Sequence, residues 1–467
     1  MATLIKNGMV VSAADQYKAD VLIDGEKIVA IGNGLEGRAE KIIDVQGKYL
    51  FPGGIDVHAH FSLPFMGTKG AGYETTAAAA VGGTTLLIDF APQPKGLSLL
   101  DSVMKHRQEE AEGKSAVDFG LHAIVMDAQE GIFNELPALI KAGVPTIKIF
   151  MAYKGTPYYA DDSIVFRMLQ KAKGVGALIC VHAENADVID VLQKQLVAAK
   201  KTEPKYHATS RPAAIEAEAT SRATLLAKVA EAPVFIVHIS CAEAMWAVRN
   251  ASEQGVAAFG ETCSHYLCLS VDNLAKPNFE GAKYVLSPPL REPWHHEQLW
   301  QAIQKGWLQV VSSDHCGFNF KGQKEMGRDD FTKIPNGAPG LEHRLAILYT
   351  YGVLKGKLSL QRMVDVFATT PAKLFGAYPR KGSISVGADA DIVVFDQNFK
   401  GKISATTSQH GVDYSPYEGF EQIGRPEKVL LRGNLIVDGG KYIAKKSQGK
   451  FIEREPYGLA YAGYSSK

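Results

Sequence analysis

The sequence predicts a (β/α)8 TIM-type barrel with a small β-sandwich domain that both ends of the chain build. Three observations predict this architecture. Apolar runs alternate with helix-compatible segments in the middle of the chain, strand-like runs with turn signals occupy both ends, and metal-capable side chains follow several of the predicted strands. With 467 residues the chain is longer than one hydrophobic core usually supports, so we expect one large and one smaller domain.

Both ends of the chain carry the pattern of antiparallel strands. Short apolar runs are separated by turn signals such as Asn7-Gly8 and Asp24-Gly25. The predicted strands are Leu4–Val11, Ala19–Ile23 and Lys27–Ile31 near the start, and Ala390–Phe395, Val429–Arg432 and Leu435–Asp438 near the end. We therefore predict a sandwich domain from residues 1–50 and 378–440, a barrel from 51–377, and a tail from 441–467.

The middle of the chain has the rhythm of buried parallel strands. Eight apolar, often β-branched runs occur in order: Ile55–His58, Thr84–Asp89, Phe119–Val125, Thr146–Phe150, Ala177–His182, Val234–His238, Ala257–Glu261 and Leu308–Ser313. Helices are predicted between them, for example over Leu99–Glu112, Ser163–Lys173, Pro212–Ala230 and Ala242–Gln254. Eight such units favour a closed barrel, whose active site lies at the carboxyl ends of the strands. An open doubly wound sheet is the alternative, less favoured because no Gly-x-Gly-x-x-Gly follows the first strand.

Composition excludes several classes of partner. Lys and Arg number 51 against 50 Asp and Glu, a net charge of +1, so no long-range field attracts nucleic acid or an anionic membrane. The first residues lack a signal-peptide pattern, and the Ala-rich stretch Thr75–Val81 is too short to cross a bilayer. Five cysteines without CxxC spacing predict neither a disulfide framework nor a zinc finger. We expect a cytoplasmic protein.

Side chains that can bind a metal, or be converted to do so, gather at one end of the predicted strands. They are His58 and His60 on the first strand, Lys148 within the fourth, His182 and His238 ending the fifth and sixth, and Asp314 after the eighth. Alone, a strand-end histidine is more often a packed residue, and a buried lysine usually pairs with a carboxylate. Five strands that place such groups at the same barrel mouth instead indicate a metal site.

Lys148 can join such a site only after it loses its positive charge, since an ammonium would repel cations. A neutral amine can react with carbon dioxide to form a carbamate, which acts as a bridging carboxylate. The predicted ligands are then His58, His60 and Asp314 on the first metal, His182 and His238 on the second, and the Lys148 carbamate on both. This mixture suits Zn²⁺ best, with Co²⁺ or Mn²⁺ as alternatives.

Two metals a few ångströms apart can share a water and lower its pKa, which gives a hydroxide nucleophile near neutral pH. Asp314 is positioned to take the proton during attack and to deliver it to the departing amide nitrogen. The predicted chemistry is amide hydrolysis without a protein nucleophile.

The same motifs resemble the dihydropyrimidinase and D-hydantoinase group of cyclic amidohydrolases. The likeness covers nearly the whole chain and rests on Pro52–His60, Lys148–Tyr153, Val181–Asn185, Glu261–Tyr266, Ser287–Arg291, Ser312–Cys316 and Ile334–Gly340. It implies hydrolytic opening of 5,6-dihydropyrimidines and hydantoins to N-carbamoyl amino acids, as in pyrimidine degradation. It also implies two zinc ions bridged by carboxylated Lys148, and a homotetramer in which the tail 441–467 packs on a neighbouring subunit; a frayed tail is the alternative.

The resemblance further implies three roles in substrate binding. Tyr153 donates a hydrogen bond to the developing oxyanion, while Ser287 and Asn336 hold the amide and imide groups of the ring. Without the resemblance, Tyr153 reads as an aromatic residue at the rim of the site, and Ser287 and Asn336 as loop residues beside Pro and Gly.

Other readings of the site stay open at this stage. An allantoinase or a dihydroorotase would share the metals, although a dihydroorotase needs a cation for the carboxylate of its substrate. A non-catalytic scaffold relative would lack the ligands, all of which are present here. Ser62, Gly72–Glu74 and the loop Gly155–Tyr159 depart from the usual pattern, which leaves side-chain preference and stereoselectivity open. His265, beside the seventh strand, is a further unassigned residue.

Overall fold

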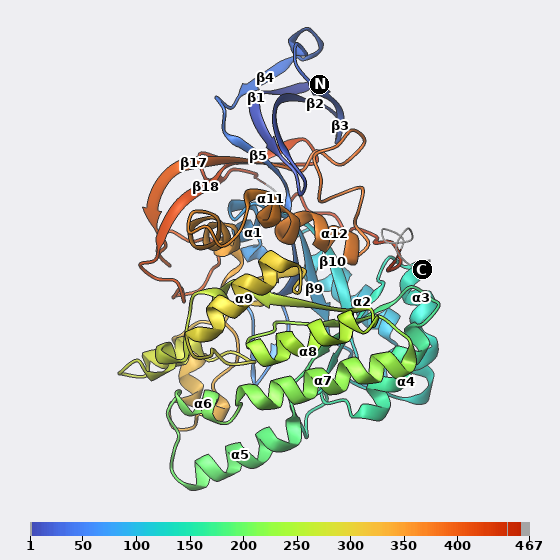
Figure 1. Cartoon of the computed structure of the whole chain (residues 1–467), viewed down its shortest axis with the longest axis vertical. Helices are drawn as coiled ribbons and strands as arrows, with labels where there is room; N and C mark the ends of the chain where they lie inside the picture. Colours follow the sequence, from blue (N-terminus) through green and yellow to red (C-terminus); the bar gives the residue numbers. More distant parts are fainter. Residues whose placement is uncertain (1, 446, 459–467) are drawn as a thin grey trace.

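The computed structural model describes residues 2–445 and 447–458 and confirms the predicted fold class (Figure 1). All eight predicted barrel strands are present and run parallel. In chain order they are β6 (Gly54–His60), β9 (Thr84–Ala91), β10 (Asp118–Ile124), β11 (Thr146–Phe150), β12 (Leu178–His182), β13 (Val234–Ile236), β14 (Ala258–Cys263) and β15 (Val310–Ser312).

The barrel closes through an interruption of its eighth strand. β15 pairs with β14, and the short strand β16 (His315–Cys316) pairs with β6, so the sheet order returns to the first barrel strand. Between the two pieces, Asp314 adopts a left-handed backbone with a φ of 44°. The carboxylate of Asp56 on β6 accepts a hydrogen bond from the backbone N–H of Ser313, at 3.2 Å. The bend therefore projects Asp314 from the strand row toward the mouth.

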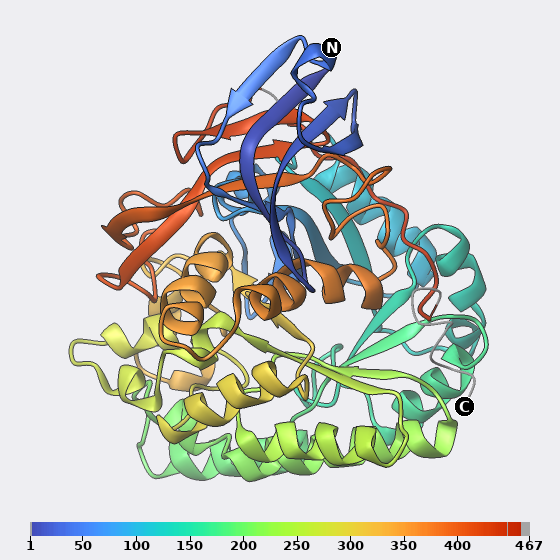
Figure 2. The same cartoon turned by 45° about the horizontal axis from the view of Figure 1, so that its top comes forward.

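Helices cover the outside of the barrel, as Figures 1 and 2 show for α7 and α8. They are α1 (Ala77–Val81), α2 (Leu99–His106), α3 (Leu136–Lys141), α4 (Asp162–Ala172), α5 (Ala186–Ala198), α6 (Tyr206–Thr209), α7 (Ala213–Ala230), α8 (Ala242–Glu253), α9 (Trp294–Lys305), α10 (Arg344–Ile347), α11 (Leu360–Val364) and α12 (Thr370–Leu374). Polar side chains fix several starts, since Ser98, Asp161 and Asn185 accept hydrogen bonds from backbone N–H groups in the first turns of α2, α4 and α5. The four helices predicted by residue range are confirmed.

The inside of the barrel is filled by alternate side chains of its strands. Leu86 and Ile88 on β9, Leu178 and Cys180 on β12, and Phe235 on β13 belong to one buried cluster. Because side chains two residues apart on a strand share a face, the next residue in the β12 row is His182. The apolar rows thus end in polar groups at the carboxyl ends of the strands.

The two ends of the chain share one curled nine-stranded sheet, drawn in blue and red at the top of Figure 2. Its strands are β1 (Thr3–Val11), β2 (Gln16–Asp24), β3 (Lys27–Gly32), β4 (Lys41–Asp44), β5 (Tyr49–Pro52), β17 (Ile392–Lys402), β18 (Glu421–Leu431), β19 (Asn434–Asp438) and β20 (Lys441–Tyr442). β5 joins the two halves by pairing with both β1 and β17. The predicted boundaries at residues 50, 377 and 440 stay predictions; β5 and β20 extend the end sheet slightly beyond two of them.

The described part of the tail lies across the amino end of the chain's own barrel. Backbone hydrogen bonds join Ile452 to Phe119, Arg454 to Gly143 and Tyr457 to Gly176. The buried Arg454 guanidinium donates to the Leu121 carbonyl oxygen at 2.5 Å. Packing on a neighbouring subunit stays a prediction for the tail, whose residues 459–467 lie outside the described part of the chain.

A buried ion cluster holds the barrel, the end sheet and the tail together. The Lys381 Nζ atom lies 2.7 Å from Asp118, 3.1 Å from Asp389 and 2.6 Å from Asp391. Asp118 on β10 also contacts Arg432, which follows β18, and accepts a hydrogen bond from the backbone N–H of Lys450 in the tail. Although burial alone would lower it, these three carboxylates raise the pKa of Lys381.

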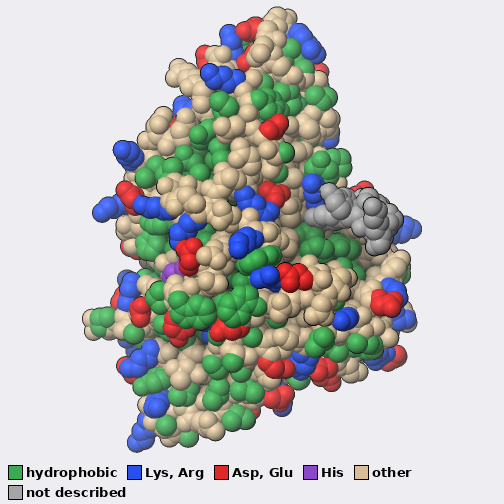
Figure 3. Space-filling model, viewed as in Figure 1, with side chains coloured by type: hydrophobic (Ala, Val, Ile, Leu, Met, Phe, Trp, Pro, Cys, Tyr) green, Lys and Arg blue, Asp and Glu red, His purple; other side chains and the backbone are tan. Residues whose placement is uncertain are grey.

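The surface is of mixed charge on the face that Figure 3 shows, where blue and red side chains are interspersed. No helix among the described residues is both long and apolar enough to span a membrane.

We predict that Lys381→Met destabilises the protein by about 3–5 kcal/mol at pH 7, because three buried carboxylates lose their common cation. Arg380→Met is the matched control, since the partly exposed Arg380 contacts the same Asp389 and its loss should cost about 1 kcal/mol or less. Urea unfolding of both variants measures the difference. Equal midpoints for the two variants would contradict the prediction.

The loss of stability caused by Lys381→Met should also depend on pH. Burial alone would raise the pKa of Asp389, but the cations Lys381, Lys27 and Arg380 lower it from 3.8 to about 2. The stabilisation from Asp389 is therefore complete above pH 3.8 and is lost as the pH falls through 2.

Candidate active site

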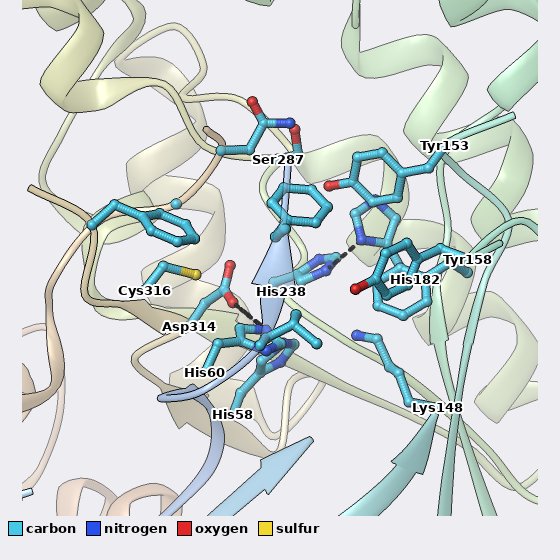
Figure 4. Close-up of a pocket in the computed structure, with 16 residues that line it drawn as sticks. His58, His60, Lys148, Tyr153, Tyr158, His182, His238, Ser287, Asp314 and Cys316 are labelled. Carbon is cyan, nitrogen blue, oxygen red and sulfur yellow. Dashed lines mark hydrogen bonds and ion pairs between the residues drawn. The ribbon is translucent and has the colours of Figure 1, made fainter. Parts of the chain in front are cut away.

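The structure brings all six predicted metal-capable residues to one pocket at the carboxyl ends of the barrel strands. The pocket is lined by His58, His60, Lys148, His182, His238 and Asp314, together with the predicted substrate-binding residues Tyr153, Ser287 and Asn336. Figure 4 shows the side chains pointing toward one another from different strands.

His58, His60 and Asp314 form the first group. The Nε2 atoms of both histidines lie 3.3 Å from Oδ1 of Asp314, and one ligand atom from each residue fits within 4.8 Å of the other two. Although burial alone would raise it, the two histidines hold the pKa of Asp314 below its usual range. An anionic carboxylate between two imidazoles is a suitable set of ligands for a divalent cation.

His182 and His238 form the second group. His182 Nδ1 and His238 Nε2 lie 2.9 Å apart, and the two rings meet edge to face. His238 lies two residues beyond β13 with a left-handed φ of 41°, which turns its ring into the mouth. Two facing imidazole nitrogens can share one proton or hold one cation between them.

Lys148 lines the same pocket as the two groups. Its side chain is fully buried, and Nζ has no hydrogen-bond partner among the described residues. Nζ stands 5.1 Å from the ring centroid of Phe90 and 4.9 Å from that of Phe150. Burial lowers the pKa of Lys148 to about 8, against the opposing charges of Asp314 and Glu261. The amine thus lacks a hydrogen-bond partner among the described residues and shares its pocket with four histidines, a setting that fits its conversion into an anionic metal ligand.

Two buried glutamates that were not predicted as site residues orient the histidines from behind. Glu184 lies 2.7 Å from His182 Nε2, and the Arg211 guanidinium donates to the same carboxylate oxygen at 2.7 Å. Burial alone would raise the pKa of Glu184, but Arg211 and His182 lower it to about 2. A carboxylate at Nε2 fixes the proton there and leaves the Nδ1 lone pair free to face the mouth.

Glu261, within β14, orients His58 of the first group. It contacts His58 Nδ1 and accepts a hydrogen bond from the backbone N–H of His238 at 3.1 Å. No lysine or arginine among the described residues forms an ion pair with it, and burial raises its pKa to about 8. Both glutamates carried a sequence signal: Glu184 follows the predicted ligand His182 by two residues, just after the fifth strand, and Glu261 ends the seventh predicted strand, which has no predicted ligand.

Tyr153, Ser287 and Asn336 form the polar end of the pocket. The Tyr153 hydroxyl interacts with the side chains of Asn336 and Ser287, and its backbone is left-handed at a φ of 63°. Burial raises the pKa of Tyr153, so its hydroxyl stays protonated and able to donate at neutral pH. His207 supports this end, because its Nε2 donates to the Leu286 carbonyl oxygen at 2.8 Å.

An apolar wall completes the pocket. Leu63, Phe65, Phe150, Tyr158 and Phe318 line it, and the Tyr158 hydroxyl donates to the Pro64 carbonyl oxygen at 2.8 Å. This contact joins the loop after β11 to the hairpin of β7 (Pro64–Phe65) and β8 (Thr68–Lys69). His265 is buried close enough to Asp314 to lower the pKa of that carboxyl, but it is not among the residues that line the pocket. Cys316 does line the pocket.

Comparison with known proteins identifies relatives that match nearly the whole chain. The amidohydrolase family matches residues 49–436. The chain is 47% identical to a D-hydantoinase from Geobacillus stearothermophilus over 99% of this chain and 98% of that protein. It is 47% identical to a D-hydantoinase from Ralstonia pickettii over 98% of this chain and 100% of that protein. The crystal structure of dihydropyrimidinase from Brevibacillus agri superposes with a TM-score of 0.96 at 48% identity and covers 98% of this chain and 99% of that one.

We predict that Glu184→Ala weakens retention of divalent metal by about 10- to 100-fold, because the His182 ring loses the group that fixes its tautomer and orientation. Glu184→Gln should weaken retention less, since its amide oxygen can still accept a hydrogen bond from His182 Nε2. Metal analysis after competition with a chelator measures both variants. Wild-type retention in Glu184→Ala would contradict this role.

Proposed function

Because the chain belongs to the amidohydrolase family, and within it to the dihydropyrimidinase and D-hydantoinase group, we propose that it opens cyclic imide rings by hydrolysis. The substrates are 5,6-dihydropyrimidines and hydantoins, and the products are N-carbamoyl amino acids. The observation that carries this proposal is the meeting of six metal-capable groups with a neutral polar end, Tyr153, Ser287 and Asn336, in one pocket.

The charge of the pocket favours a neutral ring over a carboxylate substrate. Apart from Lys148, which lies among the histidines, no lysine or arginine is found among the described residues that line the pocket. Arg211 lies 5.7 Å from the Tyr153 ring centroid but pairs with Glu184. A ring carboxylate would therefore find no unpaired lysine or arginine at the polar end of the pocket, whereas an imide would find hydrogen-bond donors.

The ligand set suits two zinc ions, with cobalt or manganese as substitutes. His58, His60 and Asp314 would hold one ion, His182 and His238 the other, and a carbamate on Lys148 would bridge both. The carbamate forms when the neutral Nζ attacks carbon dioxide, which makes one N–C bond and releases one proton. When bound, such a metal pair lowers the pKa of a water and polarises an amide carbonyl.

Side chains of the pocket bind the substrate and transfer the proton. Tyr153 donates a hydrogen bond to the oxygen of the scissile carbonyl, while Ser287 and Asn336 hold the other amide and imide groups. The Asp314 carboxylate takes up a proton and returns it to the ring nitrogen as the C–N bond breaks. The apolar wall formed by Leu63, Phe65, Phe150, Tyr158 and Phe318 would contact an exocyclic apolar substituent of the ring.

We also propose that the protein works in the cytoplasm as a homotetramer. All five cysteines are free thiols, which suits a reducing compartment.

Steady-state kinetics should show turnover of dihydrouracil and hydantoin and none of dihydroorotate or allantoin. Both enantiomers of a 5-substituted hydantoin belong in the same series, since the loops around the apolar wall set the stereochemical preference. Turnover of dihydroorotate without dihydrouracil would point to a different cyclic amidohydrolase. A protein with no bound zinc that gains no activity with zinc and bicarbonate would favour a scaffold role.

We predict that Lys148→Ala loses most of its bound metal, because the anionic bridge between the cations disappears. Lys171→Ala, at an exposed position on α4, is the matched control and should keep its metal. Metal analysis of both purified variants gives the answer. A full two-metal complement in Lys148→Ala would refute the bridge.

A further inference from the structure

A second buried lysine, Lys324, joins the two segments that carry Ser287 and Asn336. It lies in the connection from β16 to α10, at the start of the short helix η8 (Lys324–Gly327). Its side chain is fully buried and is among the largest buried side chains of the described chain. The metal-ligand set does not use it.

The amine of Lys324 binds backbone carbonyl groups of both segments. Nζ donates to the Val285 oxygen and to the Pro335 oxygen, at 2.7 Å each. The Val285 oxygen also accepts a hydrogen bond from the Gly337 N–H at 3.0 Å. Val285 precedes Ser287 by two residues and Pro335 directly precedes Asn336, so one amine holds both segments next to the pocket.

The burial of the Lys324 amine is expected to destabilise the folded protein. Among the described residues its hydrogen-bond partners are carbonyl groups rather than carboxylates, and burial lowers its pKa to about 7. An amine buried against neutral carbonyl groups is generally less favourable than an apolar side chain of the same length. A function in the site explains why an amine stands at this position.

The peptide group between Pro335 and Asn336 connects Lys324 to the pocket. In a trans peptide the C=O of one residue and the N–H of the next point in opposite directions. With the Pro335 oxygen facing Lys324, the Asn336 N–H faces the other way. No described residue accepts a hydrogen bond from this N–H, and Asn336 lines the pocket. A hydrogen bond donated to the carbonyl oxygen also polarises the peptide group and strengthens its N–H as a donor.

We propose that Lys324 is a positioning residue for substrate binding: its amine sets the peptide groups before Leu286 and Asn336 so that the Asn336 N–H donates to a carbonyl of the cyclic imide. The inference rests on the proposed function, since it assigns Asn336 a partner on the ring. Lys324 does not touch the substrate and acts only through the two backbone segments.

The test compares Lys324→Met, which keeps the length of the side chain and removes its donors, with Lys321→Met. Lys321 is exposed in the same loop and provides the same chemical change. For dihydrouracil or hydantoin, the KM of Lys324→Met should rise by about 10- to 100-fold, since a displaced Asn336 N–H would leave a buried carbonyl of the ring without its hydrogen bond. Its kcat should stay within about threefold of wild type, and its metal content should equal that of wild type.

Hydrogen exchange gives a readout that does not depend on turnover. The Gly337 amide donates to the Val285 oxygen, so peptides that cover residues 335–340 should exchange faster in Lys324→Met than in Lys321→Met. Lys324→Gln is the second variant if the methionine variant does not fold. Its shorter amide reaches one carbonyl at most, so its KM should also rise.

Unchanged KM in the folded Lys324 variants, or a loss of metal that accounts for the whole effect, would overturn the proposal. A loss of thermal stability with wild-type KM would show a structural role only and would overturn it too. A wild-type enzyme with no activity on any cyclic imide would instead contradict the proposed function. In that case, unchanged exchange of residues 335–340 would overturn the positioning role separately.

Discussion

The barrel mouth depends on the burial of one amine, Lys148, without a hydrogen-bond partner among the described residues. Around it stand imidazoles rather than carboxylates, because each nearby glutamate faces the back of a histidine: Glu261 contacts His58, and Glu184 contacts His182. Among the described residues that line the pocket, Asp314 is the only carboxylate. This arrangement presents ring nitrogens inward and keeps negative charge one layer outward, which is how proteins orient histidines toward metals.

Much of the fold could be predicted because burial on both faces leaves a direct trace in the sequence. Parallel strands such as Thr146–Phe150 are continuous apolar runs, and the end strands were visible through Asp24-Gly25 and similar turns. The interrupted eighth strand could not be predicted, since the bend at Asp314 depends on a contact between Ser313 and Asp56 that lie far apart in the chain. The path of the tail under the barrel could not be predicted for the same reason, because it depends on hydrogen bonds to distant residues and not on a local sequence pattern.

The candidate site divides in the same way. The barrel rule places strand-end residues such as His58 and His182 in one mouth, whereas Ser287 and Asn336 lie on loops and were assigned only through a family resemblance. Arg211 and Lys324 gave no signal at all, because each acts through partners that only the folded chain brings close: Glu184 for the first, and two backbone carbonyl groups for the second. Residues that support a site are therefore harder to find in a sequence than residues that form it.

The shared sheet and the closed barrel floor have a consequence for how the chain is made. β5 pairs with β17, and Ile452 and Arg454 cover the amino end of the barrel. Elements synthesised early can therefore complete their contacts only after the last part of the chain has been made. Pairings of such large sequence separation form slowly. While the nascent chain is still attached to the ribosome, the edge of β5 that will pair with β17 and the underside of the barrel remain exposed. Chaperones can bind these exposed surfaces during synthesis.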